Sequence, residues 1–125
     1  MTNPMKALII EDNADLNTLY SSALAEAGFI TESMFDGEKA QHRLQEIEPQ
    51  LIVLDLHLPK LSGADLLAQI RQDPRLQEIF IIVASADGTW TGHIGEKADM
   101  VLNKPVSYVQ LRDLGIRVYQ NLSKA

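Results

Sequence analysis

Three short, almost uninterrupted apolar runs constrain the fold of this chain more than any other feature. They cover residues 5–10 (MKALII), 51–54 (LIVL) and 79–84 (IFIIVA), and polar residues follow each of them. Runs of this length are typical of buried strands. Strands that are apolar on both faces occur where helices cover both sides of a parallel sheet, so these runs favour an α/β fold.

Segments with helical spacing separate these runs. Residues 15–27 place apolar side chains on one face before Gly28, and Asp36 can cap a helix whose face is completed by Ala40, Leu44 and Ile47 before Pro49. The remaining predicted helices are 64–72, a short turn at 94–98, and a last helix capped by Ser107; weaker strands are predicted at 29–34 and 100–102. The aromatic residues predicted to lie in the core are Tyr20, Phe29, Phe35 and Phe80. A strand and a helix thus alternate five times, which predicts a doubly wound, five-stranded parallel sheet with right-handed crossovers.

The composition limits the classes of function. At 125 residues the chain has the size of one domain, without a linker or an effector segment. It has no cysteine, which excludes disulfides and thiolate metal sites. A net charge of −6 disfavours direct binding of nucleic acid. No apolar run approaches the roughly 20 residues of a membrane span, and no signal core follows the first methionine, so we expect a cytoplasmic protein without membrane contact.

Acidic, hydroxyl and basic residues follow the predicted strands. Glu11 and Asp12 come after the first strand, Asp55 after the third, Ser85 after the fourth and Lys104 after the fifth. In open α/β sheets, ligands bind at the carboxyl ends of the strands. Each residue alone is more often a cap, a turn residue or a surface charge. Their joint placement on four strand ends predicts a single site.

The sequence around these residues resembles the receiver domains of two-component response regulators. The segments that carry the resemblance are LIIEDN, LIVLDLHLPKLSG, IIVASAD and VLNKP, in family order. The resemblance implies a flavodoxin-like sheet with strand order 2-1-3-4-5. It also implies one receiver domain, which is not an enzyme apart from assisting its own phosphorylation and dephosphorylation.

The resemblance assigns a role to each residue of the predicted site. Asp55 matches the phosphoacceptor, and Glu11, Asp12, Asp55 and the backbone carbonyl of His57 match the groups that hold Mg²⁺. Carboxylate and carbonyl oxygens suit Mg²⁺, which would neutralise the transferring oxygens. Two further pairs are implied: Ser85 and Lys104 contact the phosphoryl group, while the side chains of His57 and Asp87 tune dephosphorylation.

The resemblance also implies partners. The phosphoryl group would come from a sensor histidine kinase or a phosphotransfer protein, and the signal would pass to a downstream protein or an output domain. A homodimer is left open. Two positions depart from the family pattern and weaken the expectation of its usual aromatic switch: Val101 stands three residues before the lysine, and Lys97 replaces a common glycine. We therefore expect the segment after Ser85, which several glycines interrupt, to report phosphorylation to the partner proteins instead.

Other functions on a similar fold stay open at this point. A receiver-like docking module would keep the fold without phosphorylation, although the complete set of site residues argues against it. A haloacid-dehalogenase phosphatase would need a second aspartate two residues after Asp55, where the chain has His57. A flavin binder would need a phosphate-cradling loop after the first strand, where the chain has the acidic segment EDNAD.

Overall fold

The fold is a five-stranded sheet between two layers of helices. A computed structural model describes residues 4–86 and 92–124. The strands are β1 (Lys6–Ile10), β2 (Ile30–Met34), β3 (Leu51–Asp55), β4 (Phe80–Ser85) and β5 (Met100–Asn103). The helices are α1 (Ala14–Glu26), α2 (Gly37–Leu44), α3 (Gly63–Gln72), α4 (Gly92–Lys97) and α5 (Tyr108–Ser123).

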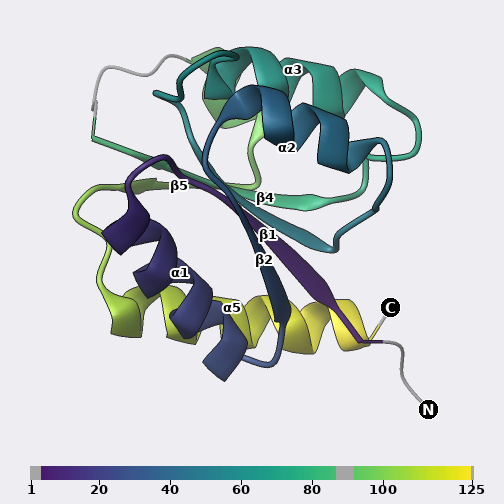
Figure 1. Ribbon diagram of the computed structural model, residues 1–125. Helices are drawn as coiled ribbons and strands as arrows, with labels where there is room; N and C mark the ends of the chain where they lie inside the picture. Colours follow the sequence, from purple (N-terminus) through teal and green to yellow (C-terminus); the bar gives the residue numbers. More distant parts are fainter. Residues whose placement is uncertain (1–3, 87–91, 125) are drawn as a thin grey trace.

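All strand pairs are parallel, and the order across the sheet is β2-β1-β3-β4-β5. Figure 1 shows α1 and α5 on one face of the sheet and α2 and α3 on the other. The predicted doubly wound, flavodoxin-like sheet is therefore confirmed. Strand order reverses between β1 and β3, which is where ligands bind in folds of this type.

Two apolar clusters, one on each face of the sheet, hold the layers together. Along β1, Ala7 and Ile9 pack in the cluster beneath α1 and α5, whereas Leu8 and Ile10 pack in the cluster beneath α2 and α3. This alternation follows from the two-residue repeat of a strand. It explains why the central strands are apolar on both faces, as their sequences indicate.

Side-chain caps begin four of the helices. The side chains of Asn13, Asp36, Ser62 and Ser107 each accept a hydrogen bond from a backbone N–H three residues later. Asp36 and Ser107 were predicted as caps, and both predictions are confirmed. The helix after Asp36 ends at Leu44, so Ile47 lies beyond it and packs from the following turn.

The aromatic residues differ from the prediction at one position. Tyr20 and Phe29 are buried, and Phe80 is partly buried against the same cluster. The prediction for Phe35 was wrong, because its side chain is 46% exposed. Phe35 falls between the end of the edge strand β2 and the cap of α2, where no layer covers it.

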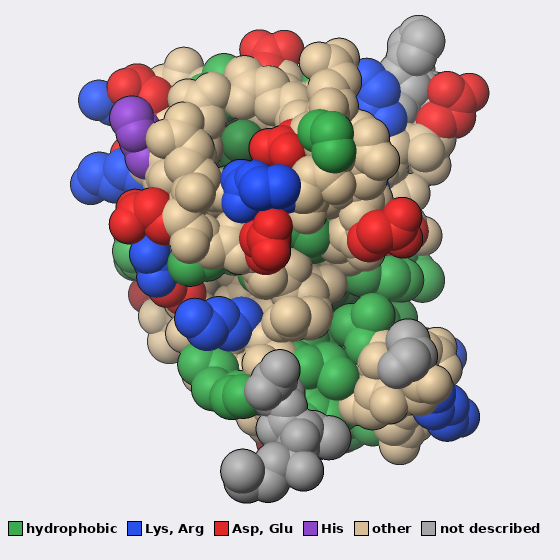
Figure 2. All heavy atoms as spheres, turned by 90° about the vertical axis from the view of Figure 1, so that its right-hand side faces the viewer, with side chains coloured by type: hydrophobic (Ala, Val, Ile, Leu, Met, Phe, Trp, Pro, Cys, Tyr) green, Lys and Arg blue, Asp and Glu red, His purple; other side chains and the backbone are tan. Residues whose placement is uncertain are grey.

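The surface at the amino-terminal edge of the sheet carries acidic and basic side chains in a mixed arrangement (Figure 2). Within the described part of the chain, no helix is long and apolar enough to span a membrane.

Candidate functional site

The carboxyl ends of four strands bring the predicted site residues to one edge of the sheet. Asp55 is the last residue of β3 and Ser85 is the last residue of β4, while Glu11 directly follows β1 and Lys104 directly follows β5. Lys104 N also donates to the backbone carbonyl of Ser85 over 2.8 Å, which joins the last two strand ends. The joint placement that the sequence predicts is therefore found in the fold.

Three carboxylates of this edge form a cluster. One carboxylate oxygen from each of Glu11, Asp12 and Asp55 lies within 4.8 Å of the others. Glu11 and Asp55 are buried, whereas Asp12 is exposed, so the cluster is open to solvent on one side. Hard oxygen donors with room for water ligands suit Mg²⁺, and the cluster fits such an ion.

Lys104 places a positive charge inside this acidic cluster. Its ammonium donates to Glu11 Oε1 over 2.7 Å and lies 3.7 Å from Asp55 Oδ1. The other oxygen of Glu11 accepts from the backbone N–H of Asn13 over 3.1 Å. Lys104 is thus bound mainly to Glu11 in this state, a contact that the sequence did not predict.

The pKa values of both members of this pair are raised, for different reasons. Burial raises the pKa of Glu11, and the neighbouring Asp55 raises it further, although the hydrogen bonds from Lys104 and Asn13 act in the opposite direction. Burial alone would lower the pKa of Lys104. The hydrogen bond to Glu11 and the charges of Asp55 and Glu11 outweigh that effect and raise the pKa.

The loop after β3 is held close to Asp55. The backbone N–H of His57 donates to Asp55 Oδ1 over 3.2 Å, and the imidazole of His57 is exposed at the edge of the site. A Cβ at Gly63 would lie 2.1 Å from the Asp55 carbonyl oxygen, and a Cβ at Gly37 would lie 1.9 Å from the Leu61 carbonyl oxygen. Only glycine permits these approaches, which fix the loop between the starts of α2 and α3.

Asn17 is a positioning residue that sequence analysis missed. It is buried on α1, and its Nδ2 lies 3.4, 3.0 and 3.2 Å from the carbonyl oxygens of Ile9, Glu11 and Met34. These contacts fasten the end of β1 to α1 and β2 and so place the acid pair. The polar residue on the apolar face of a predicted helix was the available indication.

One predicted residue cannot be placed. Asp87, predicted to tune dephosphorylation, lies outside the described residues, as do residues 88–91 of the glycine-broken segment that was predicted to carry the output. The proposed metal contact of the His57 carbonyl stays a prediction. Ser85 is fully buried beside Asp55 in the sheet, since Asp55 pairs with Ala84 in the register.

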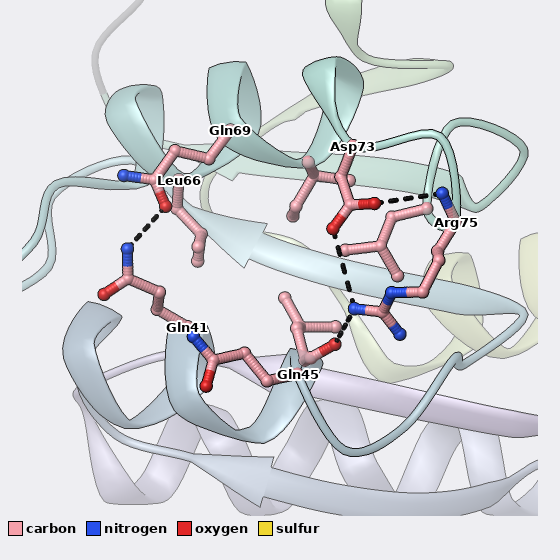
Figure 3. Close-up of a pocket in the computed structure, with 9 residues that line it drawn as sticks. Gln41, Gln45, Leu66, Gln69, Asp73 and Arg75 are labelled. Atoms are coloured by element: carbon pink, nitrogen blue, oxygen red, sulfur yellow. Dashed lines mark hydrogen bonds and ion pairs between the residues drawn. The ribbon is translucent and has the colours of Figure 1, made fainter.

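A separate hollow of about 140 Å³ lies between α2 and α3 and contains none of these residues. Figure 3 shows Gln41 and Gln69 meeting across it, with a 2.7 Å hydrogen bond. At its other end Arg75 donates to the Leu44 carbonyl over 2.7 Å. These polar groups bind one another across the hollow, so we interpret it as part of the packing between the two helices.

Comparison with known proteins identifies the family of this chain. Residues 7–114 match the response regulator receiver domain family. The two-component response regulator PhoP of Pseudomonas aeruginosa is 33% identical over 110 residues, and the phosphate regulon transcriptional regulatory protein PhoB of Rhizobium meliloti is 33% identical over 109. These alignments cover 86% and 85% of this chain and 48% of each relative. The chain therefore spans about half the length of these curated relatives.

Solved structures show the same fold. The receiver domain of a signal transduction histidine kinase from Syntrophus aciditrophicus superposes with a TM-score of 0.85 at 26% identity, covering 97% of this chain and 94% of that one. A CheY-like receiver domain from Methylobacillus flagellatus gives a TM-score of 0.83 at 24% identity, covering 93% and 99%. The matched family, the strand order and the relatives agree, and the chain belongs to the response regulator receiver domains of two-component systems.

Proposed function

We propose that this receiver domain accepts a phosphoryl group on Asp55 and thereby switches a protein-interaction surface. The observation that carries the proposal is the position of Asp55. Its buried carboxylate ends a central strand, beside two further carboxylates and 3.7 Å from the Lys104 ammonium. A buried carboxylate beside two further carboxylates and an ammonium suits phosphoryl transfer, in which a metal ion and a lysine offset the negative charge of the transferred group.

Asp55 is the nucleophile in this proposal. A carboxylate oxygen of Asp55 forms a bond to phosphorus while the bond from phosphorus to the donor breaks. The bonding electron pair leaves with the donor, which is a histidine nitrogen of the kinase or the acyl oxygen of acetyl phosphate. The hydrogen bond from His57 N–H to Asp55 Oδ1 orients the carboxylate for this attack.

The residues around Asp55 counter the repulsion between two anions. Glu11, Asp12, Asp55 and the His57 carbonyl would hold Mg²⁺, which supplies positive charge to the transferring oxygens when bound. Lys104 supplies a second positive charge and turns from Glu11 toward the phosphoryl oxygens. Ser85, at the end of the adjacent strand, donates its hydroxyl to the same group. The family resemblance assigns His57 and Asp87 to tuning the loss of the phosphoryl group by hydrolysis.

The proposed partners follow from the family. The donor is a sensor histidine kinase or a phosphotransfer protein, and the receiver of the signal is a downstream protein or an output domain. Among the relatives, PhoB is named as a transcriptional regulatory protein. The acidic charge of −6 argues that this domain does not itself contact nucleic acid. We propose a cytoplasmic location and leave dimerisation to experiment.

Labelling by a small phosphodonor tests the proposal. Wild-type protein incubated with acetyl phosphate and Mg²⁺ should gain one phosphoryl group that hydroxylamine removes, as expected for an acyl phosphate. The Asp55→Asn variant should gain none. Asp65→Asn, which changes an exposed aspartate on α3, is the matched control and should be labelled normally. An unlabelled wild type would contradict the proposal and leave a docking module as the function.

A further inference from the structure

Phe35 is an exposed aromatic residue at the same edge of the sheet as the acidic site. Its side chain is 46% exposed, although both of its neighbours in sequence contribute to the fold. Met34 makes the last pairing of β2, and Asp36 caps α2. The strand and the helix that meet at this position therefore do not explain a large apolar side chain there.

Hydrogen bonds on both sides of Phe35 place it at the rim of the site. The carbonyl of Met34 accepts from the Glu11 backbone N–H over 3.1 Å. Two residues after Phe35, the Gly37 N–H donates to the Pro59 carbonyl over 3.3 Å. Phe35 therefore lies between the end of β1, which carries the acid pair, and the loop that follows Asp55.

That loop adds further apolar surface. Pro59 is exposed, whereas Leu58 and Leu61 are half-buried over the apolar cluster beneath α2 and α3. We call Phe35, Leu58, Pro59 and Leu61 the rim patch. One exposed apolar residue is common on any protein, but an apolar patch beside polar residues of a site is typical of a surface that contacts another protein.

The depth of Asp55 determines what covers the rim patch. The Asp55 side chain is 6% exposed, and the cluster opens to solvent at the exposed Asp12. Phosphoryl transfer requires the reacting atoms to approach to about 3–3.5 Å. A protein donor must therefore insert its phosphohistidine into this opening, which brings the surface around that histidine onto the rim. Acetyl phosphate is small enough to enter without covering the rim.

We propose that the rim patch is a docking surface for the protein that donates the phosphoryl group, with Phe35 as its main apolar contact. The inference rests on the proposed function at Asp55. Apolar side chains next to the donor histidine cover Phe35 when the two proteins meet, and burial of both surfaces holds the histidine in the site. Phe35 touches no reacting atom and serves only protein donors.

A comparison of two phosphodonors tests this docking surface. The protein donor is the autophosphorylated sensor histidine kinase of the source organism that labels the wild type fastest, and the small donor is acetyl phosphate. In Phe35→Ser, kcat/KM for transfer from the kinase should fall about tenfold, as for a buried aromatic contact in an interface. Labelling by acetyl phosphate should equal that of the wild type.

Two further variants control for loss of apolar surface in general. Ile30→Ser removes a side chain that is 52% exposed at the start of the same strand, on the opposite edge of the sheet. It should leave transfer from both donors unchanged. Phe35→Leu keeps an apolar side chain and should recover most of the rate with the kinase.

Amide exchange gives a readout that does not depend on the reaction. A saturating amount of the same kinase without its phosphorylated histidine should protect the amides of residues 35–37 and 57–61. The amide of Ile30 should exchange as in the free protein. Unchanged exchange in both segments of the rim would overturn the docking surface.

The outcomes separate the two proposals. If neither donor labels the wild type, the proposed function and the docking surface are both overturned. If acetyl phosphate labels the wild type and no kinase labels it faster at equal concentration, only the docking surface is overturned. The same holds if Phe35→Ser accepts from the kinase as fast as the wild type, or if it loses labelling by both donors equally.

Discussion

Replacing Lys104 with methionine should destabilise the protein in a strongly pH-dependent way. Methionine keeps most of the apolar length of the side chain but removes the donor to Glu11 Oε1. Glu11 is 1% exposed, so its carboxylate is then buried without its cation. Removing one partner of a buried pair leaves an uncompensated charge, which is the main cost.

Protonation of Glu11 sets the size of this effect. Its pKa is already raised above the ordinary 4.5, and loss of Lys104 raises it further. A raised carboxyl pKa gives stability that is present at low pH and lost as pH rises through the folded-state value. Stability is lost only between the ordinary pKa of 4.5 and the working pH, at about 1.4 kcal/mol per pH unit, so the pH-dependent loss is limited to about 3 kcal/mol at pH 7 and to less than about 1 kcal/mol at pH 5.

Urea denaturation at pH 5 and pH 7 measures the free energy of unfolding of each variant. The double variant Glu11→Gln with Lys104→Met removes both charges and should lose the pH dependence between these values. The same measurements in an Asp55→Asn background remove the contribution of the Asp55 carboxylate, the second anion near the Lys104 ammonium. An equal loss at both pH values, or no rescue by Glu11→Gln, would refute the account of Glu11 as a buried, partner-dependent carboxylate.

Three further predictions concern the metal and the scaffold. At ten times its dissociation constant, Mg²⁺ should stabilise the wild type by about 1.4 kcal/mol in thermal melts; Asp12→Ala should show no such response. Gly63→Ala should cost about 3 kcal/mol in urea denaturation, because its Cβ would overlap a backbone carbonyl at the end of β3; at Gly115 the same change meets only side-chain atoms and should cost less. Arg71→Met should cost about 2–4 kcal/mol, since Arg71 donates to three carbonyls and a carboxylate. Arg112→Met should cost much less, because the ion pairs of Arg112 are on the surface. Similar losses for the two arginine variants, or for the two glycine variants, would contradict these predictions.

The fold and the position of the site were predictable because both depend on short-range patterns. Apolar runs mark strands, caps mark helix starts, and polar residues at strand ends must meet when the strands are parallel. Asp55 and Ser85 are the last residues of neighbouring parallel strands, so their meeting at one edge of the sheet could be predicted. The strand order came from resemblance to a family, since periodicity alone does not choose among the permitted orders.

Contacts between distant segments were not predictable from the sequence. Lys104 and Glu11 are 93 residues apart, and which anion the ammonium selects depends on distances of an ångström. Arg71 joins α3 to the end of α4 and to the carboxylate of Asp99, although it reads as an ordinary helix-end cation. Phe35 was misplaced because hydrophobicity does not show that a residue falls past the last paired position of an edge strand.

Gly37 and Gly63 contact backbone carbonyls at the two ends of the loop of residues 56–62, so the geometry of the site depends on the length of this loop. Gly37 holds the loop at Leu61, and Gly63 holds its end against Asp55. An inserted residue would separate these contacts and carry the His57 amide away from the Asp55 carboxylate. Most surface loops tolerate insertions at little cost. Here the number of residues between β3 and α3 is under the same constraint as their identity, so an insertion scan should find this loop as intolerant as the strands.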